Sequence, residues 1–196
     1  QSCQMIKRSQ ELHIIIIVLF SLLLNASSQG LKFSANNELI NNRTSYNVFA
    51  HSSPTFSKQL SISFELSLFN PNHFGYICTL IDTQNNISYS LTFANVNSSL
   101  SHLNFNIDGE RHLITIPLKH TDIGKRRWLK MHMNFNSITD SITIAIDQTE
   151  YHFKADNISP QIKPQLFFGK QGSVVDVPEF AIRKLAVYDK KKSYSF

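Results

Sequence analysis

Hydrophobic and polar positions alternate with a period of two through most of the chain after residue 29. The clearest case is residues 60–68, where leucine, isoleucine and phenylalanine alternate with serine and Glu65. A strand with this pattern places one apolar face on a core and one polar face toward water. Helical periodicity is almost absent from this region, and the pattern predicts roughly ten to thirteen strands. Similar alternation is found in residues 87–93, 103–107, 129–135 and 142–146.

Turn signals separate these segments and predict how they connect. Asp108-Gly109 stands between two alternating runs, which is typical of a β-hairpin. Near the end of the chain the apolar phase slips between Ile182 and Leu185, so we expect a β-bulge at Arg183-Lys184. Many one-sided strands with short turns and no helices predict an all-β fold, a jelly-roll sandwich of two antiparallel sheets.

The first 28 residues have the layout of a secretory signal peptide. Basic Lys7 and Arg8 precede a mostly apolar run over residues 13–24, and Ala26 and Ser28 have the small side chains expected before a cut ahead of Gln29. The run is shorter than the roughly 20 residues that cross a bilayer. We therefore expect export, to the cell surface or beyond (periplasm or outer surface in a bacterium), and a domain over residues 29–196 with no transmembrane span. An uncleaved anchor and a buried N-terminal helix remain alternatives.

Charge and cysteine content narrow the class further. The net charge is +5, and its short basic clusters at residues 125–127 and 190–192 are read as solvated strand-end charge. A nucleic-acid-binding protein would need a broader basic stripe with interleaved aromatics, so no nucleic-acid partner is expected. Cys78 is the one cysteine after the predicted signal peptide. The domain therefore has to be held by burial and strand pairing, without a disulfide.

The order of segments in the second half of the chain resembles a known family. A Trp-led strand, a hairpin ending in Asp, a short strand ending in Phe-Gly and a closing strand follow one another as in laminin-G-like domains of the concanavalin A-like lectin/glucanase superfamily. The resemblance implies the same sandwich and an exported recognition module. Related bacterial surface proteins often continue into a kelch-type β-propeller, and the alternation still running at residues 193–196 favours a chain that continues. The segments are Arg127–Phe135, Asp140–Asp147, Leu166–Gly169 and Phe180–Asp189.

Catalytic signatures of this superfamily are missing from the sequence. Its β-glucan-cleaving members carry Glu-x-Asp-x-x-Glu on one strand, because glycoside hydrolysis needs two carboxylates at the scissile bond. This chain has no such run, and its glutamates stand singly. A hydrolase would have to pair Glu65 with Glu179 or Asp147 across the fold. Nucleophile-elbow, zinc-protease and phosphate-loop motifs are absent as well. We therefore expect a protein that is not an enzyme.

Candidate ligand-binding residues lie in one loop and on polar strand faces. The loop contributes His73, Phe74 and Tyr76, although Phe74 and Tyr76 also suit the start of a core strand. Glu65 could bind a sugar hydroxyl, with a solvated strand residue as the plainer interpretation. The histidines His102 and His132 would meet if their strands were neighbours.

Calcium is the metal that the resemblance makes worth testing; no other cofactor is expected. Its candidate ligands are Asp82, Asn85 and Asp176, since calcium takes oxygen ligands from loops. Asx-type turn capping by the same side chains is the alternative.

The sequence favours an exported, non-catalytic recognition or accessory module that binds carbohydrate or a surface partner. Its partner would be a glycan or a neighbouring domain of the same protein. A structural spacer packed on a downstream β-propeller is the alternative, and it would expose an apolar patch near the last strand. A degenerate glycoside hydrolase ranks last.

Overall fold

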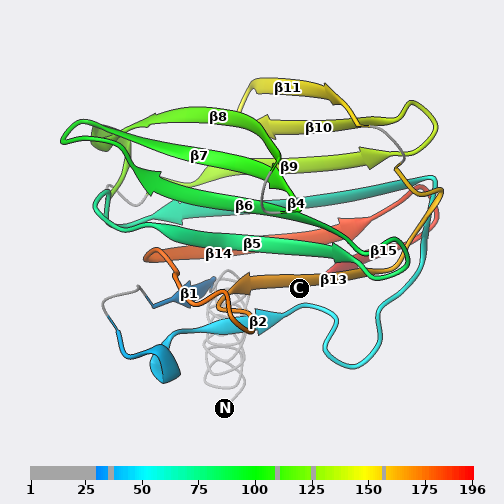
Figure 1. The fold of residues 1–196 in the computed structure, drawn as a ribbon, viewed down its shortest axis with the longest axis horizontal. Coiled ribbons are helices and arrows are strands. Elements are labelled where there is room, and N and C mark those ends of the chain that lie inside the picture. Colours follow the sequence, from blue (N-terminus) through cyan, green and yellow to red (C-terminus); the bar gives the residue numbers. More distant parts are fainter. Residues whose placement is uncertain (1–29, 35–37, 109–110, 125–126, 156–157) are drawn as a thin grey trace, which may run out of the picture. The chain divides into compact units, whose positions relative to one another are not determined.

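The strands predicted from the alternating pattern form two antiparallel sheets that pack face to face (Figure 1). The computed structural model describes residues 30–34, 38–108, 111–124, 127–155 and 158–196. Contacts divide the chain into residues 1–30 and a compact unit, Leu31–Phe196, which contains the sandwich. The predicted signal peptide lies outside the described residues. Within the described ranges, no helix is long and apolar enough to cross a membrane.

We call the two layers sheet A and sheet B. In sheet A the strand order is β1, β14, β4, β9, β10, β11, and β15 lies beside β14; in sheet B it is β2, β13, β5, β6, β7, β8. The predicted antiparallel jelly-roll sandwich is therefore confirmed. Sheet A comprises β1 (Leu31–Phe33), β4 (Gln59–Leu68), β9 (Leu129–Asn136), β10 (Ser141–Ile146), β11 (Thr149–Lys154), β14 (Phe180–Tyr188) and β15 (Ser193–Ser195). Sheet B comprises β2 (Ser45–Asn47), β5 (Gly75–Asp82), β6 (Ile87–Asn95), β7 (Leu100–Ile107), β8 (Arg111–Lys119) and β13 (Pro164–Gly169).

Short elements complete the fold. Strands β3 (Phe56–Ser57) and β12 (Gln161–Ile162) pair with each other at one end of the sandwich. The 3-10 turns are η2 (Ile40–Asn42), before β2, and η3 (His120–Asp122), which directly follows β8. The turn η3 matters below because it carries Asp122 to the edge of the sandwich.

Aromatic side chains from the two sheets meet in the core. The ring of Phe64 on β4 packs edge-on against Phe168 on β13, with centroids 5.1 Å apart. At the other side of the core, Phe135 on β9 contacts Tyr89 on β6 at 4.7 Å. Full burial of a large apolar side chain contributes about 1.5–3 kcal/mol, so these inward rows stabilise the sandwich without a disulfide. Cys78 is a free, buried thiol, and burial raises its pKa to about 12.

Two local predictions about the backbone are confirmed. Strands β7 and β8 form a hairpin in which Ile107 faces Arg111, and Asp108 has a φ of 50°. In β14 the register against β4 shifts between Arg183 and Ala186, and Lys184 has a φ of 55°, so the bulge lies where the hydrophobic phase slips. As a result Arg183 and Lys184 both reach the outer face of sheet A.

The polar face of β4 is less exposed to water than the sequence predicts. Ser61, Glu65 and Ser67 are buried, with 3%, 9% and 1% of their surfaces exposed. Longer side chains from the adjacent strands cover this face: Asn134 donates a hydrogen bond to Ser61 Oγ, and the bulge residues reach Glu65. The expectation of a fully solvated face was therefore wrong for the middle of sheet A.

Both terminal strands of the described sandwich lie on the same edge of β14. Leu31 of β1 faces Ile182, and Ser195 of β15 faces Ala186. Strands β9, β10 and β11 lie beyond β4, on the opposite side of β14 from these two strands (Figure 1).

Candidate functional site

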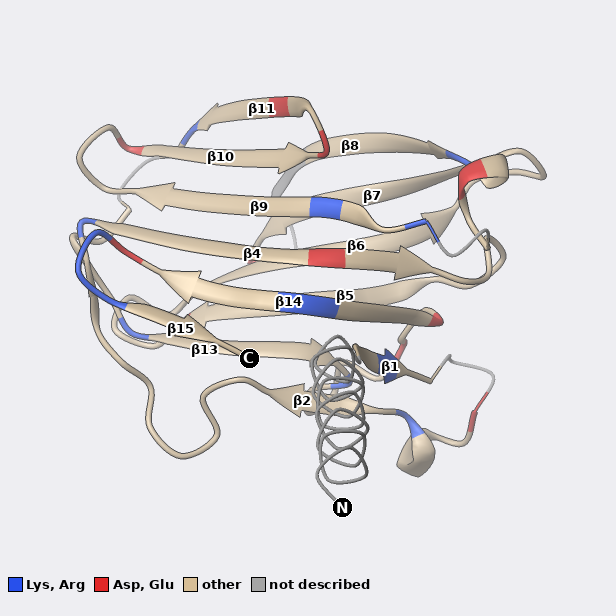
Figure 2. Ribbon diagram, turned by 180° about the vertical axis from the view of Figure 1, so that it is seen from behind, with Lys and Arg blue, Asp and Glu red and all other residues tan. Residues whose placement is uncertain are grey.

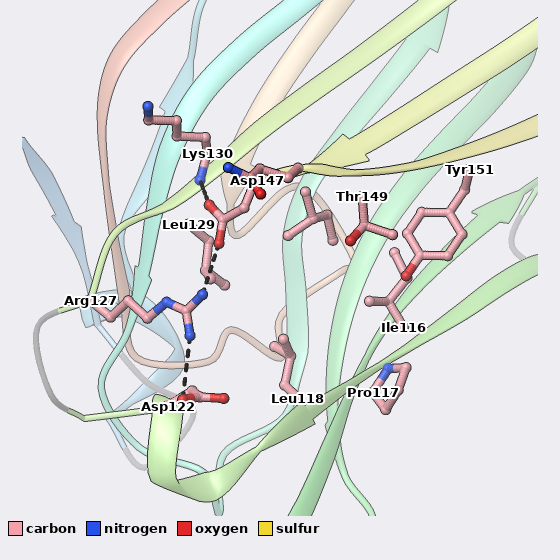
Figure 3. Close-up of a pocket in the computed structure, with 12 residues that line it drawn as sticks. Ile116, Pro117, Leu118, Asp122, Arg127, Leu129, Lys130, Asp147, Thr149 and Tyr151 are labelled. Atoms are coloured by element: carbon pink, nitrogen blue, oxygen red, sulfur yellow. Dashed lines mark hydrogen bonds and ion pairs between the residues drawn. The ribbon is translucent and has the colours of Figure 1, made fainter.

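A polar cleft of about 630 Å³ lies where β8, the start of β9 and the β10–β11 turn come together (Figure 3). Strand β8 contributes an apolar wall of Ile116, Pro117 and Leu118. The wall across from it carries Thr149 and Tyr151. The volume falls within the roughly 300–1,000 Å³ that is typical of small-ligand sites. We call this hollow the cleft.

Arg127 lies at one end of the cleft between two carboxylates (Figure 3). Its Nη2 is 2.9 Å from Asp147 Oδ2, and its Nη1 is 3.3 Å from Asp122 Oδ1. Asp147 also accepts a hydrogen bond from the backbone N–H of Lys130 at 2.8 Å, which fixes the carboxylate at the end of β10. A guanidinium has five N–H donors, so these two pairs leave further donors for a ligand.

The cleft therefore offers several kinds of interaction within one hollow. Arg127 supplies a planar, charged donor, while Asp122 and Asp147 supply acceptors. The exposed side chains of Gln148 and Thr149 add an amide and a hydroxyl. The ring of Tyr151 packs partly on the core and provides an apolar surface. Such a combination suits a hydroxylated ligand with one apolar face, of which a sugar ring is the common biological example.

A smaller hollow of about 290 Å³ lies on the outer face of sheet A. Its lining includes Ser63, Glu65, His132, Ala145 and Lys184. The register explains the hollow, because Ser63 on β4 and Ala145 on β10 both stand opposite His132 on β9, so small side chains flank the imidazole. Lys130 and Asp147 also belong to this lining. We call it the outer groove.

Glu65 in the outer groove is held by two cations. Lys184 Nζ is 2.9 Å from its Oε1, and Arg183 Nε contacts its Oε2. Figure 2 shows the basic segment of β14 beside the acidic segment of β4, with a further basic segment on β9. The hydrogen bond from Lys184, helped by Arg183 and opposed by burial, lowers the pKa of Glu65 below its ordinary value.

The carboxylates that a hydrolase would have to pair are each engaged in an ion pair. A glycosidase needs a carboxylic acid whose pKa is raised, so that it carries a proton to the leaving group. Glu65 and Asp147 do line the same groove, but each is paired with arginine or lysine. Glu179 instead pairs with Lys32 of β1 at 3.0 Å. The carboxylates that could have formed a catalytic pair therefore serve as ion-pair partners.

The structure brings Glu65 and His132 together in the outer groove but places His102 elsewhere. His102 is on β7 of sheet B, opposite Ala94 and Pro117. The condition under which His102 and His132 would meet is not fulfilled, because β6, β7 and β8 continue sheet B while β9 pairs with β4 in sheet A. The Nδ1 of His132 lies 3.5 Å from Tyr188 Oη. Burial lowers the pKa of His132, and the charge of Glu150 offsets part of that shift.

The loop candidates lie apart from both hollows. His73 Nε2 is 3.0 Å from Asn70 Nδ2, and Phe74 is 49% exposed beside the start of β5. Tyr76 lies within β5, and its backbone N–H bonds to the carbonyl oxygen of Asp176 at 2.8 Å. Neither the cleft nor the outer groove includes any of these predicted loop residues in its lining.

The candidate calcium ligands do not fit a calcium site. Asp82 is buried and accepts hydrogen bonds from the backbone N–H of Gln84 and from Asn85 Nδ2, as a turn-capping residue does. Asp176 pairs with Arg43 at 3.3 Å and lies near the start of β5, whereas Asp82 ends that strand. Calcium takes 6–8 oxygen ligands, and the described residues contain no cluster of three acidic, histidine or cysteine side chains. Calcium binding stays a prediction without support from this geometry.

Sequence reasoning missed most of the cleft. Arg127 is a half-exposed charge just before β9, as the sequence predicts, but the sequence does not indicate that it bridges Asp122 and Asp147. Tyr151 belongs to β11, a strand that the alternation identifies only weakly. The usable signal in the sequence is the predicted hairpin that ends at Asp147. Its second strand runs back toward the residues that precede β9, and Arg127 is one of them.

Comparison with known proteins defines the class of fold. No family model matches the sequence, and no curated protein matches it. The chain is similar to the solved structure of a heptameric SAP-like pentraxin from Limulus polyphemus, with a TM-score of 0.57 and 14% identity over 82% of this chain and 76% of that one. It is also similar to the laminarinase from Flavobacterium sp. UMI-01, with a TM-score of 0.51 and 13% identity over 75% and 73% of the two chains.

A carbohydrate-binding module shares the fold as well. The CBM40 of the Ruminococcus gnavus IT-sialidase, bound to alpha2,3 sialyllactose, matches with a TM-score of 0.50 and 13% identity over 82% of this chain and 89% of that one. These likenesses establish a concanavalin A-like jelly roll, which confirms the predicted resemblance at the level of the fold. At such identities the ligand has to be argued from the site.

Proposed function

We propose that this protein is an exported, non-catalytic carbohydrate-binding module that holds its glycan in the cleft. The observation that carries the proposal is the position of Arg127 between Asp122 and Asp147, in a cleft whose lining also includes Tyr151. A fixed guanidinium, two carboxylates and an aromatic surface give sugar hydroxyls both donors and acceptors.

The fold and the ion pairs support this proposal. Binding modules and carbohydrate-active enzymes share the fold, as the CBM40 and the laminarinase illustrate. The lowered pKa of Glu65 and the pairing of Asp147 with Arg127 argue for binding over hydrolysis. Export rests on the signal-peptide layout of the first 28 residues.

A glycan-array screen of the purified protein tests the proposal, followed by titration calorimetry with the sugars that bind. Thr149→Trp fills the cleft, and we expect it to weaken binding by at least about tenfold, which corresponds to 1.4 kcal/mol. Thr143→Trp is the matched control, because it adds the same side chain to the same hairpin outside both hollows. Binding that Thr149→Trp leaves intact, or a folded protein that binds no glycan, would refute the proposal.

A structural spacer is the second candidate, and one observation favours it. Phe196, after β15, is 49% exposed and packs against Phe49 with ring centroids 5.7 Å apart, while Leu31 of β1 is 44% exposed. Exposed apolar side chains near the last strand suit contact with a neighbouring domain of the same protein. In that case the array gives no selective signal, and Phe196→Ser weakens binding to the separately expressed neighbouring domain.

A further inference from the structure

We infer that the cleft and the outer groove form one continuous site for a linear oligosaccharide of several sugar units. The inference rests on the proposed carbohydrate-binding function and extends it to the size and shape of the ligand. In this arrangement the cleft holds one end of the chain, and the next units lie over the outer groove.

The two hollows share a wall made of Lys130 and Asp147, which line both of them. Lys130 lies on β9, and Asp147, which directly follows β10, lies beside it. The backbone N–H of Lys130 donates to Asp147 Oδ1, and the N–H of Asp147 donates to the carbonyl oxygen of Lys130, each at 2.8 Å. The boundary between the cleft and the outer groove therefore consists of these two polar residues.

The dimensions favour a shared ligand over two separate ones. At about 290 Å³ the outer groove falls just below the range of roughly 300–1,000 Å³ in which pockets bury a small ligand. Alone it has room only for a small ligand. As a continuation of the cleft, it adds room for a further unit above the small side chains of Ser63 and Ala145.

Polar groups continue along the path from the cleft to the groove. Asp147 presents acceptor oxygens and Lys130 an ammonium group at the boundary, and the ammonium group of Lys184 presents donors beyond it; the Lys184 side chain is 63% exposed. His132 and Tyr188 lie farther along the same face. A hydroxyl-rich chain therefore meets a polar partner at each step, whereas a ligand that filled only the cleft would leave these groups in water.

The test is affinity as a function of chain length. The full chain is titrated with two-, four- and six-unit members of each linear oligosaccharide series that binds on the array. We expect affinity to rise by at least about tenfold from two to six units. Ala145→Trp should remove that gain and leave the affinity for the two-unit sugar unchanged, whereas Thr149→Trp should weaken every member of the series.

Controls separate this inference from the proposed function. Thr143→Trp places tryptophan on the same face of β10 outside the groove and should keep the length dependence. If Ala145→Trp folds poorly, Ser63→Phe takes its place. It fills the groove from β4 and should likewise remove the gain in affinity with chain length. Equal affinity for short and long sugars, or groove variants that behave like Thr143→Trp, would overturn the inference while the cleft remains a glycan site. Absence of all glycan binding by the folded wild-type protein would overturn both.

Discussion

The guanidinium of Arg183 lies over the indole ring of Trp128, with its central carbon 4.2 Å from the ring centroid. The same arginine donates its Nε to Glu65, so an aromatic ring, a cation and a carboxylate make contact on the outer face of sheet A. Trp128 directly precedes the inward-pointing Leu129 of β9. Its position outside the inward row follows from the period of two, and the bulge in β14 brings Arg183 to meet it.

The stack between Trp128 and Arg183 predicts a measurable coupling. Stacking of a cation on an aromatic ring contributes about 0.5–2 kcal/mol, depending on exposure. A double-mutant cycle with Trp128→Leu and Arg183→Met, followed by urea unfolding, should give a favourable coupling energy in this range. Strictly additive effects would show that the two side chains are neighbours without mutual stabilisation.

Glu65 predicts a loss of stability in acid. Because Lys184 and Arg183 lower its pKa in the folded protein, the folded state binds this proton less readily than the unfolded state. The resulting stabilisation is present above the ordinary pKa of 4.5 and is lost as the pH falls through the lower folded value. Glu65→Gln should lower the free energy of unfolding at neutral pH by about 1–3 kcal/mol and flatten its decline toward about pH 3.

Urea unfolding of wild type and Glu65→Gln across this pH range checks the prediction. Asp189 also has a lowered pKa, opposed by burial and caused by N–H groups of Lys191, Lys192 and Ser57. Part of the acid sensitivity should therefore remain in the variant. An unchanged pH profile would contradict the assigned role of Glu65.

The close approach at Gly75 predicts a position intolerant of any side chain. Gly75 has a φ of 129°, and a Cβ there would lie 2.2 Å from the carbonyl oxygen of Asp176. Gly75→Ala should destabilise the protein by more than about 1 kcal/mol, since both the backbone conformation and the space exclude it. Gly172 also has positive φ, at 52°, but an added Cβ would meet nothing within 4 Å, so Gly172→Ala is the control for backbone strain alone. Equal melting temperatures for the two variants would contradict the steric argument.

His132 predicts a histidine that is neutral at pH 7 and reports on the outer groove. Burial lowers its pKa from the ordinary 6.5, against the partly compensating charge of Glu150. Glu65, Lys130 and Lys184 line the same groove, and Tyr188 contacts the ring. Because the folded state takes up this proton less readily, the contribution of His132 to stability falls as the pH drops below 6.5.

NMR titration, with the signal assigned by His132→Gln, measures this pKa directly. We expect a value below 6.5 that changes when an oligosaccharide long enough to reach the groove is bound. A pKa at or above the ordinary value would show that the imidazole is more solvated than the structure indicates.

Features that depend on residues close together in the sequence were predictable. Features that depend on which strands pair with each other were not. The inward row of β4, the hairpin at Asp108 and the bulge at Lys184 each follow from local phase. The meeting of Asp122, Arg127 and Asp147 depends on which strands become neighbours. Alternation does not determine that choice, because any apolar strand face can join the core in several orders.

The same reasoning explains the errors on polar strand faces. His102 and His132 have similar local patterns, and only the topology separates them. Burial of Ser61 and Ser67 depends on side chains from adjacent strands, such as Asn134, which no pattern within β4 reveals.

The placement of β1 and β15 along one edge of β14 has a practical consequence for engineering. Leu31 faces Ile182, and the backbone N–H of Phe196 bonds to the carbonyl oxygen of Leu185. Three strand residues span only about 10 Å. A linker of a few glycines could therefore join Phe196 to Leu31. The chain could then be reopened at the exposed turn around Asn97. Such a circular permutant would keep both hollows intact. A fused reporter would then be attached at the turn around Asn97.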